Sequence, residues 1–184
     1  MEKDTAGQLY DLFADLLAYP TPAIQAQAAV CLAQLRKSHP QSAAALERFS
    51  QIAGQLSTAR LEELYTGTFD MQPLCYPYVG YQLFGESYKR GAFMAQLNEA
   101  YHAFGYDAGN ELPDHVALIL RFLGLDSANR QGNFCQALLK EGLLPALVKM
   151  RQAFGEPSEN PYASLLAALH LFFIQTPEKE FDHA

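Results

Sequence analysis

Residues 111–123 read ELPDHVALILRFL, and the apolar side chains in this stretch recur at helical spacing. Pro113 suits the first turn of a helix, because the N–H that proline lacks has no intrahelical partner there. The apolar positions follow the i, i+3, i+4, i+7 spacing of one helical face: Val116, Ile119, Leu120 and Leu123. The stretch therefore predicts a helix that begins at Pro113 and buries one face.

Similar apolar stripes run along most of the chain, and prolines or glycines separate them. They predict further helices close to residues 9–17, 22–38, 43–54, 58–66, 93–104, 127–141 and 143–154, and one from residue 160 onward. No convincing pair of strands is found. A chain of 184 residues suits one substantial core. We therefore predict an all-α fold, a single-domain bundle of about seven to nine helices over residues 1–184.

The segment 67–85 interrupts this periodicity with prolines, glycines and aromatic residues. Its aromatic side chains include Tyr76, Tyr78, Tyr81 and Phe84. Two interpretations stay open for them. They can pack a loop onto the bundle, or they can form a wall against which a peptide docks, because aromatic side chains give a large contact area for little loss of entropy.

The charge of the chain disfavours nucleic acid as a partner. Thirteen basic and twenty acidic residues give a net charge of -7, so DNA would meet repulsion over most of the surface. Residues 58–126 hold nine acidic and only four basic side chains. That excess fits either a solvated acidic face or a site for a cationic peptide.

The motifs of common catalytic and metal sites do not occur in this sequence. The five histidines are scattered, so their spacing does not predict a metal site. Neighbours in a helix point about 100° apart, which argues against an Asp114–His115 dyad. A small helical enzyme using Glu111 and His115 for acid–base chemistry stays as an alternative, as does a helical regulatory protein. We expect no enzyme activity, no cofactor and no metal.

The sequence also bears on compartment. Cys31, Cys75 and Cys135 are too far apart for a metal-binding or redox pair, so we expect buried, reduced thiols. The first residues lack the basic and apolar regions of a secretory signal. The longest apolar stretch, residues 163–174, is too short to span a bilayer. We expect a soluble, cytoplasmic protein that does not insert into membranes.

Three short motifs, in this order along the chain, resemble the NarJ branch of the NarJ/TorD family of molybdoenzyme assembly chaperones. The first is Tyr65 followed by Phe69-Asp70. The second is Gly85-Glu86 followed by Arg90-Gly91 and Met94, and the third is Glu111-Leu112-Pro113-Asp114-His115. Their order and spacing carry more weight than any one of them. The segment from Pro73 to Phe84 departs from the pattern of the nitrate reductase chaperones.

The resemblance implies a TorD-like helical protein that binds the catalytic subunit of a molybdenum-dependent oxidoreductase, such as a respiratory nitrate reductase. Binding would use the subunit's cationic amino-terminal leader, a twin-arginine signal peptide or a remnant of one. The chaperone would hold the subunit until the molybdopterin cofactor is inserted, as a monomer or a helix-exchanged dimer. It would need no cofactor of its own.

We expect the peptide site to be an apolar groove that takes one face of a peptide helix, with carboxylates at its rim for the arginines. The candidate site residues are Tyr65, Phe69, Asp70, Tyr78, Tyr81, Glu86, Arg90, Glu111, Pro113, Asp114 and His115. A structural interpretation of the third motif remains beside this one. In it Pro113 begins a helix, Asp114 complements the helix dipole, and His115 bonds a nearby carbonyl.

Overall fold

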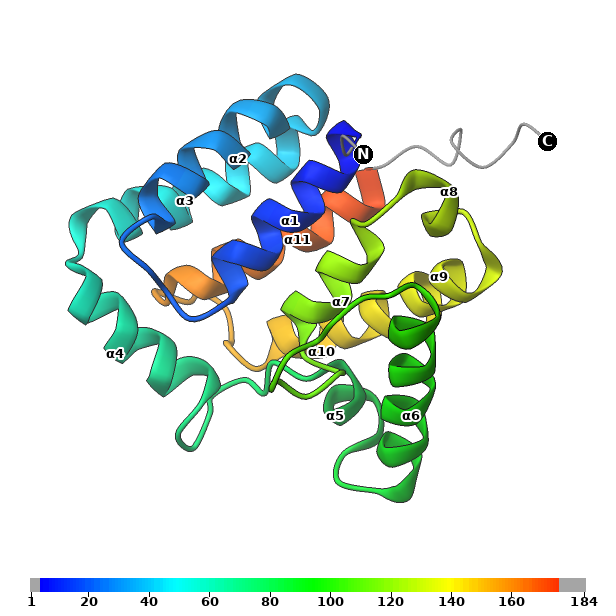
Figure 1. The fold of residues 1–184 in the computed structure, drawn as a ribbon. Helices are drawn as coiled ribbons and strands as arrows, with labels where there is room; N and C mark the ends of the chain where they lie inside the picture. Colours follow the sequence, from blue (N-terminus) through cyan, green and yellow to red (C-terminus); the bar gives the residue numbers. More distant parts are fainter. Residues whose placement is uncertain (1–3, 176–184) are drawn as a thin grey trace.

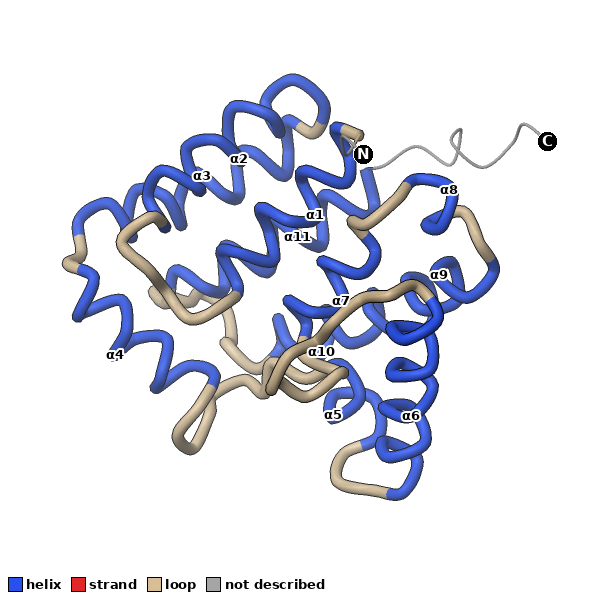
Figure 2. The backbone as a smooth tube through the Cα atoms, viewed as in Figure 1, coloured by secondary structure: helices blue, strands red, loops and turns tan. Residues whose placement is uncertain are grey.

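The computed structural model describes residues 4–175. All regular structure in that range is helical (Figure 2), which confirms the predicted all-α fold. The strand-like pairing found there is one isolated antiparallel bridge, between Tyr78 and His115. None of the helices in the described range has the length and apolar character needed to cross a bilayer. The single domain expected over residues 1–184 stays a prediction.

The amino-terminal half follows the predicted helices closely (Figure 1). Ser57 caps the fourth helix, because its hydroxyl accepts a hydrogen bond from the Arg60 N–H. Pro40 is the first residue of the third, where proline is tolerated. The helices are α1 (Thr5–Leu17), α2 (Ile24–Ser38), α3 (Pro40–Gln55) and α4 (Thr58–Phe69).

The second half divides into shorter helical segments than expected. The segments are α5 (Val79–Phe84), α6 (Tyr88–Ala103), α7 (Val116–Leu123), α8 (Ser127–Arg130), α9 (Asn133–Ala137), the π-helical η1 (Leu138–Leu143), α10 (Leu144–Gln152) and α11 (Pro161–Gln175). Gly132 separates α8 from α9, so the predicted helix over 127–141 is two. Gly142 lies inside η1 and does not end it, so α9, η1 and α10 run on without a break.

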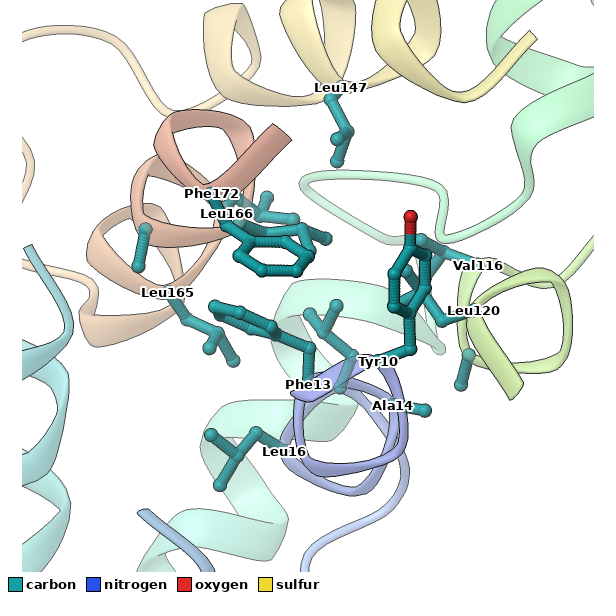
Figure 3. Packing of buried hydrophobic residues seen from close by; sticks show 14 of the residues in the cluster. Tyr10, Phe13, Ala14, Leu16, Val116, Leu120, Leu147, Leu165, Leu166 and Phe172 are labelled. Atoms are coloured by element: carbon teal, nitrogen blue, oxygen red, sulfur yellow. The ribbon is translucent and has the colours of Figure 1, made fainter. Parts of the chain in front are cut away.

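The core forms where the amino-terminal, central and carboxy-terminal helices meet. Helix α1 packs against α2 and α7, and α11 packs against α3 and α10. Figure 3 shows the aromatic centre of this packing, in which the rings of Phe13 and Phe172 lie 5.5 Å apart and those of Tyr10 and Phe172 lie 5.6 Å apart. Burying such side chains stabilises a fold by about 1.5–3 kcal/mol each. Leu97 of α6 is also fully buried.

The start of α7 differs from the sequence-based expectation. The helix begins at Val116, with His115 as its cap: Nδ1 of His115 accepts a hydrogen bond from the Ala117 N–H at 3.1 Å. The preceding backbone is held extended. The Val79 N–H donates to the Asp114 carbonyl at 2.8 Å, and the Val116 N–H donates to the Pro77 carbonyl at 2.9 Å. Because this pairing occupies the backbone groups, helical geometry starts only after it.

Two predictions for the third motif are therefore wrong. Pro113 is not the first residue of the helix, and Asp114 does not lie in the first turn, where it would complement the dipole. The side chain of Asp114 is moreover completely buried. A buried carboxylate needs partners, because removing an ion from water without compensation is strongly unfavourable.

Candidate peptide-binding cleft

A cleft of about 360 Å³ gathers residues from the first and third motifs. It opens between the loop after α1, the end of α4, the segment 77–78 and the start of α7. Six of the predicted site residues line it: Tyr65, Phe69, Asp70, Tyr78, Glu111 and His115. Its other walls come from Ala18, Tyr19, Pro77, Ala117, Leu118 and Arg121. Residues 46 positions apart in sequence, Tyr65 and Glu111, thus share one depression.

Aromatic rings held by one another form much of the wall. The ring of Tyr65 meets Tyr19 edge-on with centroids 5.4 Å apart, and Phe69 lies 5.1 Å from Tyr65. The Tyr65 hydroxyl donates to the Leu17 carbonyl at 3.3 Å, which ties α4 to the end of α1. Across the cleft, Tyr78 packs edge-on against His115 at 5.5 Å. These contacts fix the ring faces before any ligand arrives.

Two carboxylates give the cleft its charge. Glu111 accepts hydrogen bonds through Oε1 from the Tyr78 hydroxyl at 3.2 Å and from the Leu112 N–H at 2.9 Å. Burial and the nearby Glu111 raise the pKa of Tyr78 to about 12. The pKa of Tyr65 is raised by burial first, and by Glu111 and Asp70 as well. A negative potential therefore reaches the aromatic walls.

The one cation in the lining is already paired. Arg121 donates to Asp15 of α1 at 2.7 Å, and both side chains are about one third exposed. No ion pair to Asp70 or Glu111 forms within residues 4–175. The cleft therefore presents carboxylate oxygens beside the faces of aromatic rings, and both kinds of group bind cationic side chains.

Behind the cleft lies a buried ion pair that we call the latch, made by Arg90 and Asp114. Nε and Nη2 of Arg90 donate to the two carboxylate oxygens of Asp114 at 2.8 and 3.2 Å. The Arg90 side chain is 15% exposed and that of Asp114 is 0% exposed. The latch joins α6 to the segment before α7.

The latch also supports the aromatic wall. The Arg90 guanidinium lies over the rings of Tyr78 and Tyr81, at 5.2 and 5.7 Å from their centroids. Gly80 packs so closely that an added Cβ would lie 2.8 Å from Oδ2 of Asp114. The Pro113 carbonyl accepts a hydrogen bond from the Tyr101 hydroxyl at 2.7 Å. Hence Arg90, Pro113 and Asp114 hold the cleft wall and do not line the cleft.

His115 combines a position in the cleft with a structural task. Burial lowers the pKa of its imidazole, and the nearby carboxylates of Glu111 and Asp114 oppose that shift. The ring is therefore neutral at pH 7. Because Nδ1 accepts from the Ala117 N–H, the neutral ring carries its proton on Nε2. The predicted bond from His115 to a carbonyl is replaced by this cap.

Two predicted residues lie elsewhere. Tyr81 stacks against Tyr76, with ring centroids 3.9 Å apart, and sits beside Arg90. Glu86 is exposed in the turn before α6. Conversely, sequence reasoning missed Tyr19 and Arg121 as lining residues. Tyr19 stands beside Pro20 in a loop without periodicity, so no pattern pointed to it.

Three other kinds of site have weaker support in the structure: a second cavity, a metal site and a reactive cysteine. A larger cavity of about 620 Å³ lies between α1, α9 and α11, but none of the candidate residues lines it. No group of three or more potential metal ligands comes together in the part of the chain that the structure describes. All three cysteines are free and buried, and burial raises the pKa of Cys31 and of Cys75 to about 12. Such thiols are poor nucleophiles.

Two comparisons with known proteins found similarities to this chain. The family model described as "Nitrate reductase delta subunit" matches residues 33–168. The chain belongs to this family. Its fold is similar to the crystal structure of a protein named as a redox enzyme maturation protein, from Archaeoglobus fulgidus. The identity is 21%, the TM-score is 0.63, and the match covers 95% of this chain and 96% of that one. No curated protein matches.

Membership in the nitrate reductase delta subunit family confirms the resemblance noted from the three motifs. The matched range contains all eleven candidate residues, from Tyr65 to His115. The similar fold extends the agreement over nearly the whole chain. Together these findings give the family of the chain and the fold that it shares with the protein from Archaeoglobus fulgidus.

Proposed function

We propose that this protein binds the catalytic subunit of a molybdenum-dependent oxidoreductase and holds it for insertion of the molybdopterin cofactor. The observation that carries the proposal is the cleft itself, where Tyr65, Asp70 and Glu111 of two separate motifs meet. The subunit's cationic amino-terminal leader, a twin-arginine signal or its remnant, enters this cleft. A respiratory nitrate reductase is the client class that the family suggests.

The electrostatics of the cleft support a cationic ligand. Glu111 and Asp70 bring negative charge to a depression whose only guanidinium is neutralised by Asp15. A guanidinium that binds a carboxylate there also gains contact with aromatic ring faces. Such a site binds by charge and shape and performs no reaction, so the protein turns over no substrate.

Its setting follows from this role. The client's leader is present before export, so the chaperone acts in the cytoplasm. It works as a monomer or as a helix-exchanged dimer, and as a single domain. It needs no cofactor, because the cofactor is inserted into the client. A nucleic-acid partner is disfavoured by the charge of -7.

The test begins with capture of the client. The full chain is purified from its native cell, and the bound protein is identified by mass spectrometry. We expect a molybdoenzyme catalytic subunit, and capture should fail or weaken when that subunit's leader is deleted. Capture of unrelated proteins alone would contradict the proposal. So would an enzymatic reaction carried out by the pure protein.

Calorimetry then measures the leader alone. We expect a dissociation constant of about one micromolar, which corresponds to roughly 8 kcal/mol. Binding should show a negative heat-capacity change, because apolar surface is buried. A matched control is Glu99→Gln in α6, which removes one exposed carboxylate outside the cleft, against Glu111→Gln inside it.

A further inference from the structure

The size of the cleft limits what can enter it. An α-helix with its side chains is about 10–12 Å across and rises 5.4 Å per turn, so one turn occupies roughly 500 Å³. The cleft has about 360 Å³. A whole turn of helix is therefore larger than the cleft, which suits one or two side chains of a bound segment. We expect the rest of that segment to lie against the surface next to the opening.

A loop that we call the rim, residues 71–76, borders the opening. It joins two wall segments, since Asp70 precedes it and Pro77 follows it. Three of its side chains are apolar and exposed: Met71 at 75%, Leu74 at 49% and Tyr76 at 37%. Figure 1 shows this loop projecting beyond the end of α4. Exposed apolar groups gathered beside a pocket mark an interaction surface.

The rim is held in place although its apolar side chains are exposed. The Cys75 N–H donates to the Thr68 carbonyl at 2.9 Å, which closes the loop at its base. The Thr68 hydroxyl accepts a hydrogen bond from Nδ2 of Asn160 at 2.9 Å. Gln72 adopts a φ of 53°, in the left-handed region that non-glycine residues seldom occupy. Such a φ is energetically unfavourable and persists only where the surrounding structure fixes it.

One carboxylate oxygen of Glu111 is available to a ligand beside the aromatic rings of the cleft. Both hydrogen bonds to Glu111 within residues 4–175 end on Oε1, which leaves Oε2 for a ligand. The molecule already shows the matching arrangement once: the Arg90 guanidinium lies over the Tyr78 ring while it binds a carboxylate. The cleft repeats these two partners, ring and carboxylate, around an unfilled space.

We propose that the cleft and the rim together recognise a cationic amphipathic segment of the partner protein. One arginine side chain enters the cleft between Asp70 and Glu111, and the apolar side chains next to it lie on Met71 and Leu74. This proposal rests on the proposed function and gives it a recognition rule. It reverses the arrangement expected from sequence, which placed the apolar groove inside and the carboxylates at the rim.

The experiment is a cycle of protein variants against peptide variants. The probe is a synthetic peptide of the amino-terminal residues of the captured catalytic subunit, made with its arginines intact, with each arginine replaced by lysine or citrulline, and with neighbouring apolar residues replaced by serine. The protein variants are Asp70→Asn with Glu111→Gln, and Met71→Ser with Leu74→Ser. A matched control is Val30→Ser with Val148→Ser, since these side chains are also exposed, at 50% and 42%, but lie on α2 and α10.

We expect each cleft or rim variant to weaken binding by about tenfold or more, with the control unchanged. Replacing one arginine by citrulline should weaken binding to the wild type and have no further effect on the Asp70/Glu111 variant. Serine in the peptide should likewise lose its effect in the Met71/Leu74 variant. Circular dichroism and melting curves verify that all variants stay folded.

Two outcomes would overturn the inference without touching the proposed function. One is a rim variant that binds the leader as tightly as the wild type. The other is capture of the catalytic subunit with no dependence on its arginines. If no molybdoenzyme subunit is captured and no leader binds, the proposed function itself fails, and the inference fails with it.

Discussion

Two carboxylates three positions apart, Glu111 and Asp114, have opposite surroundings. Asp114 is fully buried and binds the Arg90 guanidinium through both oxygens. Glu111 is exposed at the cleft and accepts two hydrogen bonds through one oxygen. The latch and the cleft thus divide a single motif into an architectural half and a ligand-facing half. Mutations in the two halves should differ in kind.

This division changes the meaning of a mutation in Asp114. From sequence alone, replacing it should leave the fold nearly intact, because a dipole interaction contributes only about 0.3–1 kcal/mol. The structure instead places Asp114 in a buried ion pair with Arg90, whose guanidinium also packs on the ring of Tyr78. Loss of binding in an Asp114 variant would therefore not show that Asp114 contacts a ligand. Glu111 and Asp70 are the informative positions.

The largest expected effect comes from breaking the latch on one side. Arg90→Met leaves the Asp114 carboxylate buried without its partner, which should lower the free energy of unfolding by about 3–5 kcal/mol. Chemical denaturation followed by circular dichroism measures this change. The double variant Arg90→Met with Asp114→Leu removes both charges and should recover most of the loss. A single variant as stable as the wild type would mean that the pair contributes nothing.

Crowding the latch should have the next largest effect. In Gly80→Ala, the new Cβ would approach Oδ2 of Asp114 to 2.8 Å and Cδ1 of Phe93 to 2.9 Å. We expect a loss of about 1–3 kcal/mol, as for other overpacked sites. Gly91→Ala in α6 is the control. Its Cβ would meet nothing within 4 Å, so the variant should gain about 0.5–1 kcal/mol. Equal effects would contradict the close packing at Gly80.

A smaller effect concerns pH and His115. Burial lowers the pKa of this imidazole from 6.5, so its contribution to stability is complete above pH 6.5. As the pH falls, the unfolded chain takes up a proton that the folded ring resists, and the free energy of unfolding decreases until the folded pKa is passed. His115→Asn keeps a side chain that can cap α7 but does not titrate.

Denaturation at about pH 7.5 and about pH 5.5 compares the two proteins across the ordinary pKa of histidine. The wild type should lose more stability than His115→Asn on going to the lower pH. The other histidines and the carboxylates are common to both proteins, so their contributions cancel in the comparison. An identical loss in both would show that His115 is not held neutral by burial.

The smallest effect on stability should come from the ligand-facing half. Glu111→Gln removes an exposed charge and can retain the hydrogen bond from Tyr78, so the free energy of unfolding should change by about 0.5 kcal/mol or less. Binding of the client's leader should nevertheless weaken. Destabilisation as large as that of Arg90→Met would place Glu111 with the latch and remove the contrast between the two halves.

Much of the fold follows from local patterns. The stripes ending at Leu17, the cap at Ser57 and the proline at Pro161 mark helix limits that the structure reproduces. These signals act within one or two turns, so the sequence reveals them directly. The start of α7 could not be read in this way. It depends on hydrogen bonds to Val79 and Pro77, more than thirty residues earlier in the chain.

The candidate site shows the same limit. Motif residues such as Tyr65 and Glu111 could be nominated from sequence, and they do line one cleft. Which motif residues line the cleft and which support its wall could not be predicted from sequence. The burial of Asp114, for example, is set by α6 and by the close approach of Gly80. Tyr19 enters the cleft only because α1 ends beside α4. Tertiary packing, and not residue type, decides which side chains face the opening.

The packing of α11 against α3 has a consequence for synthesis of the chain. The Ser42 hydroxyl donates to the Ala168 carbonyl at 2.7 Å, so α3 packs against α2 first and meets α11 only near the end of translation. Gln175 follows Gln55 by 120 positions, and synthesis of this length takes roughly 6 to 24 s at about 5–20 residues per second. During that interval the apolar stripe of α3 is open to the α11 of another copy. Crowded polysomes should therefore favour exchange of α11 between neighbouring nascent chains.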